Sequence, residues 1–187
     1  MGSPLNSQNE HKYKELSSIF SAHDIEIEWV KMKYEEIQAD TTEEISLDSC
    51  RKLQSVIEGT FFMEDTGLYI SPLRGFPGPY SSYVNSTIGN RGILSLLGID
   101  RRAYFQTVIS LSYRRKVYQF SSTLRGSIST EERGKNGFGF DPVFIPEGEE
   151  LTLAEMDPER KNTISHRRKA AEKLIEFIKT GNELNNE

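Results

Sequence analysis

Apolar residues recur at intervals of three and four in several parts of the chain, and this spacing predicts amphipathic helices. Thr41 followed three places later by Glu44 is a capping box, so one helix should begin immediately after Thr41. Ser165 is a candidate N-cap for the most regular helix, near the C-terminus. The expected helices cover residues 10–22, 42–57, 82–97 and 166–180.

Strands are predicted where apolar residues alternate with polar ones or form short continuous runs. These segments are residues 24–34, 60–64, 103–113 and 116–126, with a further short strand inside 134–146. Glycines and prolines at 71–78 predict a loop. Helices and strands are interleaved, so the expected fold class is α/β or mixed α+β. We expect a single domain over 1–187, with a frayed polar tail at 181–187.

Charge and composition narrow the function classes. The formal net charge of -5 disfavours binding to a nucleic-acid backbone, although small phosphorylated ligands need only a few local lysines. The chain has one cysteine, Cys50, and therefore no internal disulfide, which suits a reducing compartment. No apolar stretch is long enough to span a bilayer and no secretory signal is visible. A cytoplasmic protein that binds neither nucleic acid nor membrane is expected.

Two clusters suggest phosphate and metal chemistry. Ser7, Asn9 and Lys12 open the first helix, where backbone N–H groups and a lysine attract anions. On these residues alone, a capped helix with a solvated lysine is the favoured interpretation. Glu36 and Asp65 offer hard carboxylate oxygens, and a protein usually binds Mg²⁺ through one or two such carboxylates. Asp65 is expected at the end of an apolar strand, where it either meets a ligand or starts a turn.

Two later clusters suggest a base-binding site. Phe138 lies between glycines in a segment that ends at Asp141, and its ring can stack on a nucleobase or belong to the core. Lys161, His166 and Arg167 gather cationic donors before and at the start of the last helix, where they oppose the helix dipole. Charges placed against the dipole indicate an anionic or acceptor-rich partner.

Taken together, these stretches resemble the inosine triphosphate pyrophosphatase (Ham1-like) family, in its archaeal form. Six segments match in the family's order: residues 7–12, 36–38, 64–68, 75–78, 137–142 and 161–167. The resemblance implies two α/β lobes around an elongated mixed sheet, with a deep cleft between them, and a homodimer. It also implies an enzyme that converts ITP, dITP and XTP to the monophosphate and pyrophosphate, with Mg²⁺ as cofactor.

The resemblance also assigns roles to residues. Asp65 matches the catalytic proton acceptor, and Glu36 and Asp65 match the Mg²⁺ ligands. His166 and Arg167 match the pair that recognises the base. The remaining substrate contacts that it implies are Ser7, Gln8, Asn9, Glu10, His11, Lys12, Thr66, Phe138, Gly139, Phe140, Asp141 and Lys161. Two residues depart from the family pattern: Gln8 replaces a small residue, and Thr66 replaces serine but keeps a hydroxyl.

Other functions remain open at this stage. A Maf-like pyrophosphatase of other specificity and a non-catalytic nucleotide-binding module both fit the phosphate-binding clusters. Asp65-Thr66-Gly67 also carries the three letters of a dimeric aspartic protease, although Glu64 stands where those enzymes prefer an apolar residue.

Overall fold

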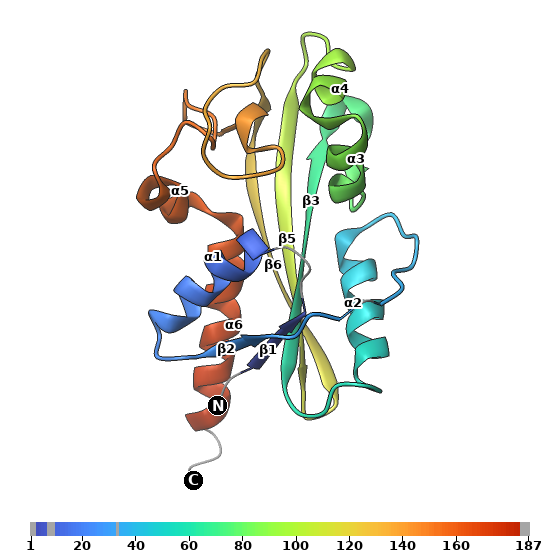
Figure 1. The fold of residues 1–187 in the computed structure, drawn as a ribbon, viewed down its shortest axis with the longest axis vertical. Helices are drawn as coiled ribbons and strands as arrows, with labels where there is room; N and C mark the ends of the chain where they lie inside the picture. Colours follow the sequence, from blue (N-terminus) through green and yellow to red (C-terminus); the bar gives the residue numbers. More distant parts are fainter. Residues whose placement is uncertain (1–2, 7–9, 33, 184–187) are drawn as a thin grey trace.

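The computed structural model describes residues 3–6, 10–32 and 34–183, which form a mixed sheet flanked by helices (Figure 1). The strands are β1 (Ser3–Asn6), β2 (Ile27–Trp29), β3 (Phe61–Ile70), β4 (Pro77–Gly78), β5 (Arg102–Tyr113), β6 (Lys116–Ile128) and β7 (Phe144–Pro146). The helices are α1 (Glu10–Ser21), α2 (Thr42–Leu53), α3 (Ser81–Thr87), α4 (Gly89–Ser95), α5 (Pro158–Ile164) and α6 (His166–Glu183), with 3₁₀ turns at Ser71–Leu73 and Asp141–Val143. The α/β class is confirmed.

The sheet has the strand order β2-β1-β3-β5-β6-β7, and β4 pairs with β3 off this path. β1 is parallel to β2 and β3, whereas β3, β5, β6 and β7 are antiparallel. The long strands β3, β5 and β6 run the height of the molecule (Figure 1). In this view α1 and α6 lie to the left of the long strands, and α2, α3 and α4 lie to the right (Figure 1).

Most predicted elements are present, with shifted ends. Thr41 caps α2 as predicted, since its hydroxyl accepts from the Glu44 N–H. The strand expected over 24–34 is formed only at Ile27–Trp29, and the segment 82–97 divides into α3 and α4. Helix α6 continues past Gly181 to Glu183, so the predicted frayed tail is wrong for residues 181–183, and residues 184–187 lie outside the described residues. Helix α5 was not predicted, although Asp157 caps it and Pro158 opens it.

The expectation that Asp65 ends its strand is wrong. β3 continues through Asp65-Thr66-Gly67 to Ile70, because the ladder with β5 pairs every residue from Phe61 to Ile70. Gly67 permits this, since a Cβ there would lie 2.7 Å from the carbonyl oxygen of Gly78 on β4. A local turn signal is therefore overridden by strand pairing.

Side-chain alternation on β3 places a polar band between two apolar cores. Phe62 belongs to a core that α1 and α6 cover, and Leu68 and Ile70 belong to a second core that includes residues of α3 and α4. Glu64 and Thr66 occupy the positions between them on the same face. Thr107 continues the band on β5, where it pairs with Thr66. A functional site can form at this band without exposing either core.

Among the described residues, no helix combines the length and the apolar character that crossing a membrane requires.

Candidate active site

A cleft of about 830 Å³ opens at the polar band and receives residues from α1, α2, β3, β5, α6 and the 137–141 loop. The structure brings into it the described site residues that the sequence predicts. These are Glu10, His11, Lys12, Glu36, Asp65, Thr66, Phe138, Gly139, Phe140, Asp141, Lys161, His166 and Arg167. Ser7, Gln8 and Asn9 lie outside the described residues.

Glu64 is the centre of the charged network at the floor of this cleft. Its carboxylate is fully buried and lies 2.9 Å from the Lys12 ammonium and 3.1 Å from Nε of Arg167. Burial alone would raise the pKa of Glu64, but Arg167 and Lys12 outweigh it and hold the pKa at about 2. Glu64 is therefore an anion that accepts hydrogen bonds and fixes two cations.

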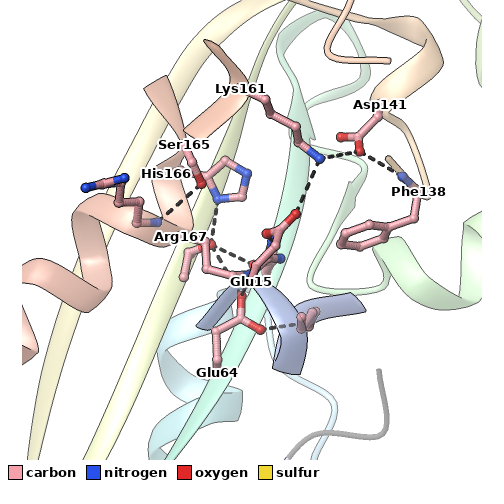
Figure 2. A network of polar contacts seen from close by, with 12 residues as sticks. Glu15, Glu64, Phe138, Asp141, Lys161, Ser165, His166 and Arg167 are labelled. Carbon is pink, nitrogen blue, oxygen red and sulfur yellow. Dashed lines mark hydrogen bonds and ion pairs between the residues drawn. The ribbon is translucent and has the colours of Figure 1, made fainter. Parts of the chain in front are cut away.

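Arg167 is buried and has two carboxylate partners (Figure 2). Besides Glu64, it contacts Glu15 of α1 through its Nη1 atom. Its guanidinium also lies 5.6 Å from the centre of the Phe138 ring. The charge at the start of α6 is thus compensated within the protein, so it does not by itself require a ligand.

Asp65 points to the opposite face of β3 from Glu64, in keeping with strand alternation. Its Oδ2 is buried and has no hydrogen-bond partner in the described structure. Burial raises the pKa of Asp65 to about 6, with Lys12 opposing the shift and the negative charges of Glu64 and Glu36 adding to it. A carboxylate with this pKa can accept a proton near neutral pH.

The carboxylates of Glu36 and Asp65 line the same cleft, and the charge of Glu36 adds to the raised pKa of Asp65. Within the described residues, no group of three or more His, Cys, Asp or Glu side chains could hold a metal ion. Mg²⁺ needs no such cage, because it takes one or two carboxylates and shares its other positions with water and phosphates. The unpartnered Oδ2 of Asp65 together with Glu36 fits that ligand set.

The loop after β6 is held by Asp141. Its carboxylate accepts from the Phe138 N–H at 2.8 Å and lies 2.7 Å from the Lys161 ammonium. Gly137 is required here, because a Cβ at this residue would lie 2.0 Å from Asp141 Oδ2. Asp141 thereby fixes both an aromatic ring and a cation at the cleft. Phe140 lines the cleft too, although its side chain belongs to the second core, which contains Leu68 and Ile70.

The ring of Phe138 is stacked on the ring of His11, with 5.2 Å between centroids and 14° between planes. Lys161 also lies 5.3 Å from the centre of the same ring. A base that stacks on Phe138 must therefore either displace His11 or use the other face of the ring.

His166 is buried between β5 and the cleft. Its ring stacks on Phe105 at 5.1 Å, and its Nδ1 lies 2.6 Å from the hydroxyl of Thr107. Burial lowers the pKa of His166 well below its ordinary value, and the nearby Arg167 charge lowers it further. The imidazole is neutral at physiological pH.

Several residues of the cleft and of the hydrogen-bond network behind it were not predicted from the sequence. Glu15 lies one helical turn after Lys12 and shares its face of α1, which was a usable signal. Thr107 lies between Phe105 and Ile109 on one face of β5, and a polar residue between two apolar ones was also a usable signal. For Tyr34, no sequence pattern indicated a place in the site. Tyr34 lines the cleft, and burial raises its pKa, with the charges of Asp65 and Glu36 adding to the shift.

The sequence model of the Ham1 family matches residues 5–177 of this chain. A dITP/XTP pyrophosphatase of Pyrococcus horikoshii is 46% identical over 175 residues, which cover 92% of this chain and 94% of that protein. A dITP/XTP pyrophosphatase of Saccharolobus solfataricus is 43% identical, with 93% of this chain and 92% of that protein covered.

Solved structures agree with the sequence comparison. A HAM1 protein from Coxiella burnetii superimposes with a TM-score of 0.84 at 30% identity, over 96% of this chain and 100% of that one. The Ham1 protein of Staphylococcus aureus superimposes with a TM-score of 0.83 at 30% identity, over 96% of this chain and 99% of that one.

Proposed function

The chain belongs to the Ham1 family, and from this premise we propose that it hydrolyses the triphosphates of deaminated purines, namely ITP, dITP and XTP. Water attacks the α-phosphorus, the bond from that phosphorus to the α–β bridging oxygen breaks, and the products are the nucleoside monophosphate and pyrophosphate. The observation that carries this assignment is the buried Asp65 carboxylate, whose Oδ2 has no partner among the described residues, in a cleft that also holds Glu36, Lys12 and Lys161.

Asp65 is the general base in this proposal. Burial raises its pKa to about 6, which makes the carboxylate a competent proton acceptor at neutral pH. The proton of the attacking water passes to this carboxylate. Glu64, its neighbour, cannot serve in the same way, because its two cationic partners keep its pKa at about 2.

Glu36 and Asp65 would hold Mg²⁺. When bound, the ion supplies positive charge that neutralises the triphosphate and aligns it for attack. The charge of Glu36 adds to the raised pKa of Asp65, so these two neighbouring carboxylates would together favour a divalent cation between them.

Lys12 and Lys161 are assigned to the phosphates. Each ammonium reaches the cleft and is held by a carboxylate of the fold, Lys12 by Glu64 and Lys161 by Asp141. Lysines fixed in this way stabilise the charge that develops on the leaving pyrophosphate without having to be ordered during the reaction.

The base is assigned to the region of Phe138, His166 and Arg167. Phe138 offers a ring for stacking, and the two α6 residues provide polar atoms near it. Arginine donates hydrogen bonds and cannot accept them, so it suits the 6-oxo group of hypoxanthine or xanthine and opposes the 6-amino group of adenine.

A panel of nucleoside triphosphates, with and without Mg²⁺, tests the function. Purified protein should release pyrophosphate and monophosphate from ITP, dITP and XTP far faster than from ATP or UTP, scored by chromatography. Release of orthophosphate, preference for UTP, or full activity in EDTA would each contradict the assignment.

We also propose a cytoplasmic homodimer. Tyr83, Ile88, Leu96 and Ile99 are exposed apolar side chains in and just after α3 and α4, and a second copy could cover them. Sedimentation should give the mass of two chains, and Ile99→Asp should shift it toward one.

A further inference from the structure

Three short contacts connect Glu64 to His166 across the floor of the cleft. The Thr66 hydroxyl donates to Oε1 of Glu64. Oγ1 of Thr66 lies 2.7 Å from Oγ1 of Thr107, and Oγ1 of Thr107 lies 2.6 Å from Nδ1 of His166. The hydroxyls come from paired positions on β3 and β5, so the sheet register fixes the order of the chain.

The direction of these hydrogen bonds follows from counting protons. The carboxylate of Glu64 lies 2.9 Å from the Lys12 ammonium and 3.1 Å from Nε of Arg167. Paired with these two cations it only accepts, so the single hydroxyl proton of Thr66 is used on it. The contact between Thr66 and Thr107 must then use the proton of Thr107. Thr107 has no proton left for His166, and the third contact requires a proton on Nδ1 of the histidine.

A neutral imidazole carries only one N–H, so a proton on Nδ1 leaves Nε2 of His166 as a bare acceptor. Cations at Arg167, Lys161 and Lys12 keep the ring neutral, with burial as the larger cause of its lowered pKa. No hydrogen bond to Nε2 is made by the residues that the structure describes. This nitrogen lies on the side of the ring toward Lys161, away from the Thr107 contact (Figure 2).

We propose that Glu64, acting through Thr66 and Thr107, holds His166 in the Nδ1–H tautomer so that Nε2 accepts the N1–H of a 6-oxopurine. The base-reading step rests on the function proposed above. Thr66 and Thr107 are positioning residues in it, and His166 is the residue that meets the base.

His166 and Arg167 together then complement a lactam edge. Arg167 donates to the 6-oxo oxygen, and Nε2 of His166 accepts from N1–H. Adenine reverses both groups, because its 6-amino group donates and its N1 accepts. It therefore places donor against donor and acceptor against acceptor. Guanine shares the lactam edge, so this pair does not exclude it.

The tautomer can be observed directly in the wild-type protein. The chain has three histidines, so ¹⁵N-histidine labelling gives three imidazole spectra, and His166→Gln identifies the one that belongs to His166. Long-range ¹H–¹⁵N correlation at neutral pH should show a protonated Nδ1 and an unprotonated Nε2. A protonated Nε2 would overturn the proposal, whatever the activity of the enzyme.

Two variants test the consequence for specificity. Thr107→Val removes the hydroxyl that accepts from Nδ1, so the Nε2–H tautomer becomes accessible. The ratio of kcat/KM for ITP to kcat/KM for ATP should then fall about tenfold, the size expected for one mismatched buried hydrogen bond. Thr107→Ser keeps a hydroxyl and should retain both the wild-type ratio and the wild-type tautomer.

Purine riboside triphosphate separates N1 from position 6, since its N1 accepts and it has no 6-substituent. Its kcat/KM relative to that of ITP should rise in Thr107→Val and stay at the wild-type value in Thr107→Ser. An unchanged ratio in Thr107→Val, with the histidine shown to have switched tautomer, would overturn the base-reading step. If wild-type protein failed to hydrolyse ITP but had an unprotonated Nε2, the proposed function would fall with the base-reading step, and the hydrogen-bond order would stand.

Discussion

Nε of Arg167 donates to Oε1 of Glu64 at 3.1 Å, although the two residues are 103 positions apart in the chain. The contact joins the first turn of α6 to the middle of β3. It offsets a positive charge that the helix dipole disfavours, and it fixes the ionised state of Glu64. Arg167 therefore has a structural role in addition to the base contact that we propose for it.

Arg167→Ala should reduce the preference for ITP over ATP. The guanidinium suits an acceptor at position 6 and opposes an amino group there. Its loss should therefore lower kcat/KM for ITP more than for ATP, by about 5- to 150-fold in the ratio if one buried hydrogen bond worth 1–3 kcal/mol is involved. Steady-state kinetics on both substrates measures this ratio.

Arg168→Ala is the matched control, because that side chain is partly exposed and forms an ion pair with Glu172 on the same helix. It should leave the ratio unchanged. Equal losses on ITP and ATP in Arg167→Ala would assign Arg167 to the phosphates or to the fold alone, and base reading would pass to His166.

Glu64→Gln should flatten the dependence of stability on pH in acid. The folded-state pKa is about 2 against an unperturbed 4.5, so the folded state binds the proton less readily than the unfolded state. The resulting stabilisation, on the order of 3 kcal/mol, is present above about pH 4.5 and is lost as pH falls toward 2. Urea unfolding across this range measures it.

The variant should also be less stable at neutral pH, because Lys12 and Arg167 lose their buried anion. Glu176→Gln, on the exposed face of α6, should behave like the wild type. If Glu64→Gln and wild-type protein lost stability in parallel on acidification, Glu64 would not be the ionised centre of the network.

Asp65→Asn should lower turnover of ITP by at least 10²–10⁴-fold, the range typical for loss of a general base. Binding of ITP should be largely retained, because the phosphate and base contacts lie on other residues. Calorimetry and pyrophosphate release measure the two effects, with exposed Asp40→Asn as the control. Turnover near the wild-type rate would refute the assignment of Asp65.

Lys161→Ala should weaken binding of ITP more than binding of IMP, since its ammonium is assigned to the outer phosphates. The same is expected of Lys12→Ala. Lys169→Ala, an exposed lysine on α6, should affect neither ligand. Calorimetric titrations that showed equal losses for ITP and IMP would place these lysines elsewhere in the site.

Phe138→Ala should raise KM for all purine triphosphates alike, because stacking contributes about 1–3 kcal/mol per base and reads no base edge. The wild-type ring is already stacked on His11, so part of the loss should be offset by the released imidazole. A fall in melting temperature with unchanged KM would instead make Phe138 a structural residue.

The sequence was sufficient for the α/β class, for the capped start of α2 and for many, but not all, of the residues that line the cleft. Such features are carried by short segments, in which apolar spacing, a capping box or a loop glycine acts over a few residues. Even the missed helix α5 had a local signal in Asp157 and Pro158.

Only the tertiary structure decided how those residues act on one another. The strand through Asp65-Thr66-Gly67 continues because β5 pairs with it along its whole length, which no local turn signal reveals. Glu64 and Asp65 are neighbours in sequence, yet strand alternation puts them on opposite faces. Arg167 and Lys12 contact Glu64 and hold its pKa at about 2. Burial and nearby negative charge raise the pKa of Asp65 to about 6. Charge and burial act through space, so the sequence could name the two carboxylates, and only the fold could give them different chemistry.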